Sequence, residues 1–138
     1  MIRIFLFQDE VNNTLNWLGK AEERLDNIAL LLDGENTPSL VEKAKRQQSD
    51  LQADFEKNKI KLDRAVTLGN TILANADSAA VGTLKHWIGA LSAGWQEVNA
   101  WIDQLGDRIK VQLTLFILSL FYLLLNFPIR KNLIKFIL

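Results

Sequence analysis

Residues 81–109 read VGTLKHWIGALSAGWQEVNAWIDQLGDRI, and the spacing of their apolar side chains decides the fold. The apolar residues alternate steps of three and four along the chain: Val81, Leu84, Ile88, Leu91, Trp95, Val98, Ile102, Leu105 and Ile109. This seven-residue repeat places one continuous apolar stripe, here called the seam, along a helix. Fully burying each such side chain is worth roughly 1.5–3 kcal/mol, so the seam predicts packing against partner helices.

The stretch 8–32 carries the same repeat and predicts a first helix. Its seam has one polar member: Val11, Thr14, Leu18, Ala21, Leu25, Ile28 and Leu32. Trp17 and Leu15 lie beside seam positions and widen the apolar stripe, so that the helix can contact two partners.

Residues 38–75 predict a second helix whose seam is weaker. The seam positions are Val41, Ala44, Gln48, Leu51, Phe55, Asn58, Leu62, Ala65, Gly69, Ile72 and Ala76. Gln48, Asn58 and Gly69 suit a seam poorly, so we expect this helix to be the weakest of the three and the readiest to bend.

Polar residues mark the breaks between the helices. Gly34 is a candidate C′ residue for the first helix. The second helix begins in one of two ways: Thr37 caps it with Pro38 as the first helical residue, or Ser39 caps it and Glu42 completes a capping box.

The third helix, expected over residues 79–110, follows a break at residues 75–78 in which Asp77 or Ser78 can act as the cap. Three helices with short connections predict an all-α fold: an antiparallel, left-handed three-helix coiled-coil bundle at residues 7–110, after an N-terminal extension at residues 1–6. The predicted structural core comprises Trp17, Leu18, Leu25, Leu51, Phe55, Leu62, Leu84, Ile88, Leu91, Trp95, Val98 and Ile102.

Residues 7–109 resemble one spectrin repeat in helix length, in the position of the breaks and in Trp17 of FQDEVNNTLNWL, which matches the tryptophan characteristic of that family. Residues 41–101, which begin VEKAKRQQSDLQADFEK, are similar to rod repeats of spectraplakins, the giant linkers of actin and microtubules. Gly94 and Gly106 depart from the pattern, because glycine disfavours a helix interior.

The resemblance implies a structural repeat that serves as a spacer and interaction module in the rod of a cytoskeletal linker. Its implied partners are neighbouring spectrin repeats or other cytoskeletal proteins, and its implied location is the cytoplasm and the cytoskeleton. Binding of actin and microtubules is implied for the parent linkers, whose filament-binding domains this chain lacks.

Residues 111–129, VQLTLFILSLFYLLLNFPI, have a different character because they hold no charged residue. A bilayer core requires about 20 apolar residues, so this hydrophobic helix is a candidate transmembrane segment, followed by a basic and apolar tail at residues 130–138. The alternative function is therefore a small helical protein anchored in a membrane by its C-terminal part, with the bundle in the cytosol.

A further alternative makes both ends translated intron sequence. Residues 5–8, FLFQ, match a pyrimidine tract ending in CAG, as at a splice acceptor, and Val111 requires a codon that begins with GT, as at a splice donor. Under this hypothesis, residues 9–110 are one internal exon of a longer gene.

The residue inventory predicts no enzyme, no cofactor, no metal site and no small-molecule substrate. The chain has no cysteine, and His86 is its one histidine, which we interpret as a surface residue. No phosphate-binding loop, calcium loop or zinc-ligand spacing is present in the sequence.

Seven basic residues between positions 43 and 64 do not predict nucleic-acid binding. They alternate with acids, as Arg46 does with Glu42, at the spacing of ordinary intrahelical ion pairs, which is typical of a solvated helix face. Residues 9–110 hold 12 basic and 16 acidic residues, a net charge of −4. The four tryptophans are interpreted as bundle core, and no stacking platform for bases is predicted.

Overall fold

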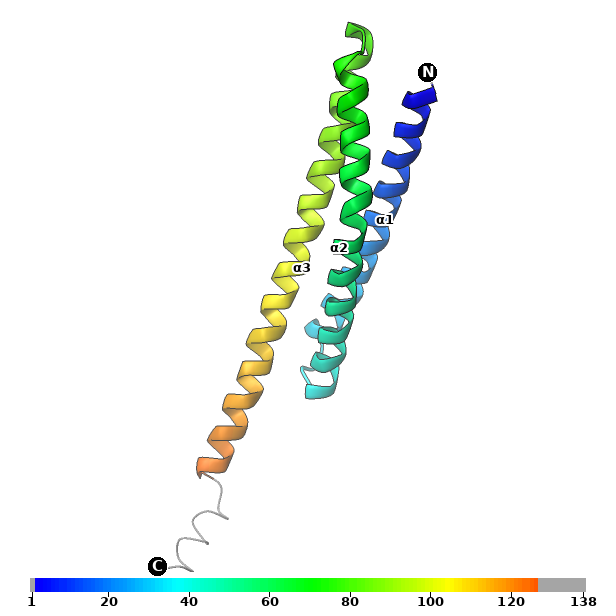
Figure 1. Ribbon diagram of the computed structural model, residues 1–138. Helices are drawn as coiled ribbons and strands as arrows, with labels where there is room; N and C mark the ends of the chain where they lie inside the picture. Colours follow the sequence, from blue (N-terminus) through cyan, green and yellow to red (C-terminus); the bar gives the residue numbers. More distant parts are fainter. Residues whose placement is uncertain (1, 127–138) are drawn as a thin grey trace, which may run out of the picture.

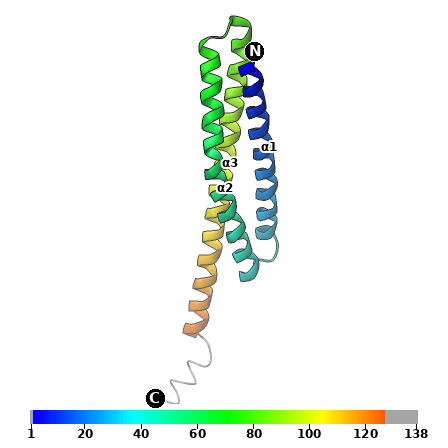
Figure 2. The same cartoon turned by 45° about the vertical axis from the view of Figure 1, so that its right-hand side comes forward.

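A computed structural model describes residues 2–126 as three helices and two short connections: α1 (Ile2–Asp33), α2 (Pro38–Ala74) and α3 (Ser78–Asn126). The helices lie side by side and alternate in direction, and α3 continues past the turn between α1 and α2 (Figures 1 and 2). The predicted all-α three-helix bundle is confirmed.

The core lies between the three helices and follows the seams. All seven seam positions of α1 are buried, although Thr14 among them is polar. Asn58 is the seam position within α2 that is only partly buried, and Ala76, just beyond the end of α2, is also partly buried. In α3 the partly buried seam positions are Val81 and Ile88. Apolar burial along these stripes is what favours the bundle over three separate helices.

Capping side chains begin α2 and α3. The hydroxyl of Thr37 accepts a hydrogen bond from the backbone N–H of Leu40 at 3.3 Å, and Pro38 is the first helical residue. The carboxylate of Asp77 accepts from the N–H of Ala80 at 3.3 Å. Gly34 follows the end of α1, but no glycine in residues 2–126 has a positive φ, so the expected left-handed C′ conformation is not adopted.

Two helices are longer than expected. Residues 2–6, expected as an extension, belong to α1, because no proline or glycine interrupts the chain between Ile2 and the first seam residue. The expected end of the third helix near residue 110 is replaced by continuous helix to Asn126, because no proline or glycine follows Gly106 before Pro128. The rest of the hydrophobic segment, residues 127–129, and the tail at residues 130–138 lie outside the described residues.

The glycine in the seam of α2 makes room for an aromatic ring. Phe7 of α1 is fully buried, and its ring lies against Gly69 and 5.9 Å from the ring of Trp87, measured between centroids. A Cβ atom on Gly69 would stand 2.7 Å from the Phe7 ring, which is closer than atoms can approach without a shift. The smallest residue is therefore what the packing at this end of the bundle requires.

The glutamine in the same seam is satisfied in a similar way. Gln48 is buried, and its side-chain nitrogen donates to the backbone oxygen of Ile102 at 3.3 Å and lies 3.4 Å from the side-chain oxygen of Gln52. A Cβ atom on Gly106 would stand 3.0 Å from that nitrogen. Gly106 thus leaves space in α3 for an amide that would otherwise be buried without a partner.

Candidate functional site: the tryptophan groove

An aromatic layer joins the three helices near the middle of the bundle. Trp95 of α3 stacks on Phe55 of α2 with ring centroids 4.0 Å apart and on Trp17 of α1 at 5.8 Å. Trp17 and Phe55 are themselves 6.1 Å apart. Offset-stacked aromatic pairs are worth about 0.5–1.5 kcal/mol beyond the area they bury, so this layer fixes the relative height of the helices.

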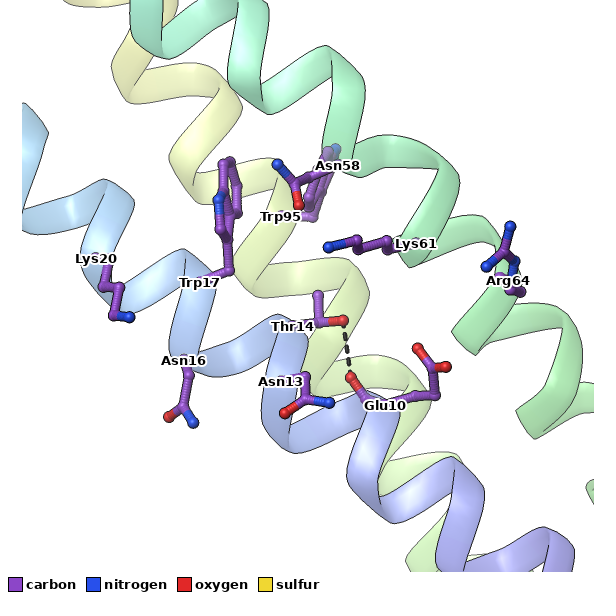
Figure 3. A pocket seen from close by; sticks show the side chains of 10 residues that line it. All are labelled: Glu10, Asn13, Thr14, Asn16, Trp17, Lys20, Asn58, Lys61, Arg64 and Trp95. Carbon is purple, nitrogen blue, oxygen red and sulfur yellow. Dashed lines mark hydrogen bonds between the residues drawn. The ribbon is translucent and has the colours of Figure 1, made fainter.

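Beside this layer, two polar seam residues open a groove between α1 and α2. Thr14 donates its hydroxyl hydrogen to the carbonyl of Glu10 at 2.8 Å, and the Asn58 amide donates to the carbonyl of Asp54 at 2.8 Å. Both side chains are thus bonded to their own helices and do not bridge the gap. The resulting cavity of about 470 Å³, here called the tryptophan groove, has Trp17 and Trp95 in its lining (Figure 3).

The lining of the tryptophan groove is polar at its edges, and most of its charged residues among those described are basic. Figure 3 shows Lys61 extending from α2 toward α1, with Arg64 farther along α2 and Glu10 facing them from α1. The full set of lining residues is Glu10, Asn13, Thr14, Asn16, Trp17, Lys20, Asn58, Lys61, Arg64 and Trp95. Three cations therefore share the lining with one carboxylate.

The two cations of α2 are not neutralised by close ion pairs. Within the described part of the chain, no carboxylate oxygen lies within 4.0 Å of Lys61 or Arg64. Within residues 2–126, Arg24 pairs with Asp54 and Arg108 pairs with Asp33, each at 2.8 Å and each partly exposed to solvent. Such exposed pairs contribute about 0–1 kcal/mol, so they adjust the bundle without defining it.

The sequence pattern alone treated Lys61 and Arg64 as members of a solvated face. Both residues are exposed, and they also lie at the edge of a groove whose lining includes two tryptophans. The sequence feature that hints at the groove is the pair of polar seam residues, Thr14 and Asn58. Residues three or four positions from each of them on the same helix lie beside any gap that these short polar side chains leave.

The predicted core residues occupy the interior to different degrees. Ten of the twelve are buried, whereas Trp17 and Ile88 are partly buried against the core. Phe7 is a fully buried core residue that the predicted core set lacks. Its place four residues before Val11 continues the seam and was the signal that could have identified it.

Histidine, aspartate and glutamate side chains are the candidate metal ligands of this cysteine-free chain. His86 is exposed on α3. Within residues 2–126, no group of three or more histidine, aspartate or glutamate side chains is placed to hold a metal ion.

The end of α3, residues 111–126, is a second notable surface, here called the apolar extension. Most of its large apolar side chains have half or more of their surface exposed, among them Leu118 at 58% and Phe121 at 62%. Leu113 and Phe116 still pack against the core. By length and composition, α3 is the one described helix that could cross a membrane, a test that core helices of soluble proteins also pass.

Comparison with curated proteins gives matches along most of the chain. It is 32% identical over 110 residues, or 79% of its length, to microtubule-actin cross-linking factor 1, isoforms 6/7, of Homo sapiens. It is 32% identical over 109 residues to microtubule-actin cross-linking factor 1 of Rattus norvegicus, and 24% identical over 105 residues to utrophin of the same species.

These relatives are far longer than the matched region. The chain spans 3% of the length of the human protein, 2% of the rat cross-linking factor and 3% of utrophin. No family model matches the chain. No solved structure matches it significantly.

Proposed function

We propose that this chain, which is related to spectrin-repeat proteins, acts as a spacer and interaction module in the rod of a linker between cytoskeletal filaments. The similarity to the cross-linking factor and to utrophin supports a cytoskeletal spectrin-type repeat and a structural, non-enzymatic class. The spacer role, the neighbouring repeats and the cytoskeletal partners are parts of the proposal.

The observation that carries the proposal is the path of the chain through the bundle. α1 begins at one end of the bundle and α3 leaves at the other (Figure 1), so the chain traverses the bundle lengthwise. A helix rises 1.5 Å per residue, so α2, with its 37 residues, spans roughly 55 Å. A unit with this path can be joined in series and can add a fixed length to a rod.

The proposal is tested by long-read sequencing of the transcript across the codons for Asp9 and Lys110. A mature message that joins these codons to further helical repeats supports a repeat in a rod, and it makes the segment after Lys110 translated intron sequence. A message that reads through Val111 to Leu138 and then stops contradicts the rod position.

A second candidate function, membrane anchoring through the C-terminal part of the chain, is favoured by the apolar extension, whose side chains are exposed on several faces of α3. The test is flotation of the full chain with phosphatidylcholine vesicles. An anchored chain floats with the vesicles, and a double substitution Leu118→Arg with Phe121→Arg lowers the floated fraction, because an arginine costs about 2.5–3.5 kcal/mol at the centre of a membrane helix.

The matched control replaces two apolar residues exposed on the bundle, Leu30→Arg with Ile60→Arg, which are 69% and 62% exposed. This control keeps the floated fraction if the extension is the anchor. Recovery of the unsubstituted chain in the vesicle-free fraction contradicts anchoring.

A further inference from the structure

We propose that the tryptophan groove binds an acidic peptide segment of a partner protein, with carboxylates of the peptide paired to Lys61 and Arg64. This goes beyond the spacer function and does not depend on it, because the groove is a property of the folded bundle.

The groove has the dimensions and the anatomy of a recognition site. Its volume of about 470 Å³ lies within the range of roughly 300–1,000 Å³ that ligand-binding pockets occupy. The half-buried Trp17 provides most of the accessible aromatic surface, Trp95, 7% exposed, adds a small part, and polar side chains surround them (Figure 3). An apolar centre with a polar rim is the arrangement found at protein interfaces.

The charge of the lining selects an anionic partner. Among the described residues, Lys20, Lys61 and Arg64 line the groove together with a single acid, Glu10, although the bundle as a whole carries more acids than bases. Carboxylates are the complementary groups, and complementary charge governs both the specificity and the rate of association. Neither Lys61 nor Arg64 must break a recorded ion pair in the described chain before it binds a partner.

A peptide fits this lining better than a nucleic acid does. Asn13, Asn16 and Asn58 line the groove, and each amide can both donate and accept hydrogen bonds, as a peptide backbone requires. A phosphate backbone accepts hydrogen bonds only.

The test measures fluorescence anisotropy of a fluorescein-labelled hexaglutamate peptide titrated with the full chain at low salt. A nonionic detergent covers the apolar extension without adding charge. The double variant Lys61→Gln with Arg64→Gln is expected to bind about fivefold or more weakly, since hydrogen bonds between charged groups are the strong ones. The control, Lys57→Gln with Lys59→Gln, removes the same charge from exposed positions of α2 outside the groove and is expected to change affinity less than about twofold.

A variant that is expected to bind the peptide more tightly provides an independent test. Glu10→Gln removes the one carboxylate that the described residues contribute to the lining, and it is expected to strengthen binding about twofold to threefold. Glu23→Gln, on an exposed part of α1 outside the groove, is not expected to strengthen binding. Circular dichroism establishes that each variant keeps its helix content.

Three results would overturn the proposal. One is the absence of peptide binding by the unsubstituted chain, and another is an equal loss of affinity in the two double variants. The third is displacement of the peptide by a twelve-residue oligothymidylate at lower concentration than by unlabelled hexaglutamate, which would assign the groove to nucleic acid.

Discussion

At the residue scale, the contact between Phe7 and Gly69 predicts a reversal of the usual preference for alanine in helices. Alanine is favoured over glycine in a helix interior by about 0.8–1.0 kcal/mol. A Cβ atom at position 69, however, would meet two ring atoms of Phe7 at 2.7 and 2.8 Å and a side-chain atom of Ile88 at 3.0 Å. Overpacking costs about 1–3 kcal/mol, which offsets or exceeds the alanine preference, so Gly69→Ala is expected to lower the free energy of unfolding by up to about 2 kcal/mol.

Gly19 supplies the matched control, because it lies inside α1 and a Cβ atom there meets nothing within 4 Å. Gly19→Ala is expected to raise the free energy of unfolding by about 0.5–1 kcal/mol. Urea denaturation of both variants checks the pair. Stabilisation by Gly69→Ala similar to that of Gly19→Ala would show that Phe7 does not pack where the structure places it.

The aromatic layer predicts a large cost for truncating its central ring. Trp95 contacts aromatic rings of both other helices and is 7% exposed. Trp95→Ala is expected to lower the free energy of unfolding by about 3–5 kcal/mol through the cavity it leaves, as measured by denaturant melting. Trp101→Ala, at a half-buried position, should cost clearly less. A loss below about 1 kcal/mol for Trp95→Ala would mean that the predicted register is wrong.

Individual residues could be predicted from the sequence only where the seam repeat specifies them. The repeat identified which side of each helix faces the core, because burial depends on position along one helix. It could not pair Gly69 with Phe7, Gln48 with Gly106 or Thr14 with Asn58, since those pairs depend on the relative height of two helices. The position of each helix along the bundle axis is fixed by the aromatic layer, whose three rings come together only when the chain folds.

At the scale of the helices, the start of α2 decides between two capping arrangements that the sequence left open. The hydroxyl of Thr37 accepts from the N–H of Leu40, whereas Ser39 lies within the first turn. Thr37→Ala is therefore expected to lower the free energy of unfolding by about 1 kcal/mol. Ser39→Ala should change it by less than about 0.5 kcal/mol, and thermal melting compares the two. A larger cost for Ser39→Ala would favour the capping box with Glu42.

The number of helices follows from the sequence more directly than their ends do. Thr37-Pro38 and Asp77 are local signals, so the two turns could be located from the sequence. No helix-breaking residue separates residues 2–6 from the rest of α1, or residues 111–126 from the rest of α3. Apolar residues without proline or glycine continue a helix whether or not it is packed. The apolar extension is helical for this reason and remains largely exposed.

At the scale of the whole molecule, the bundle joins its three helices into one structure with an open groove on one side. The three-helix architecture and the resemblance to spectrin-repeat proteins could be recognised from the sequence. The tryptophan groove could not, because each of its walls looks like an ordinary charged or amphipathic helix surface until α1 and α2 lie side by side.

The central claim, that the three helices fold as a single cooperative unit, is tested most directly by pulling the full chain in an optical trap. The sequence contains no cysteine, so cysteines introduced in place of Asp9 and Lys110 provide the only attachment points. We expect one abrupt unfolding step that releases about 300 Å, because roughly 100 extended residues span about 350 Å and the folded ends stand roughly 35–50 Å apart. A gradual extension without a step, or several smaller steps, would contradict the claim.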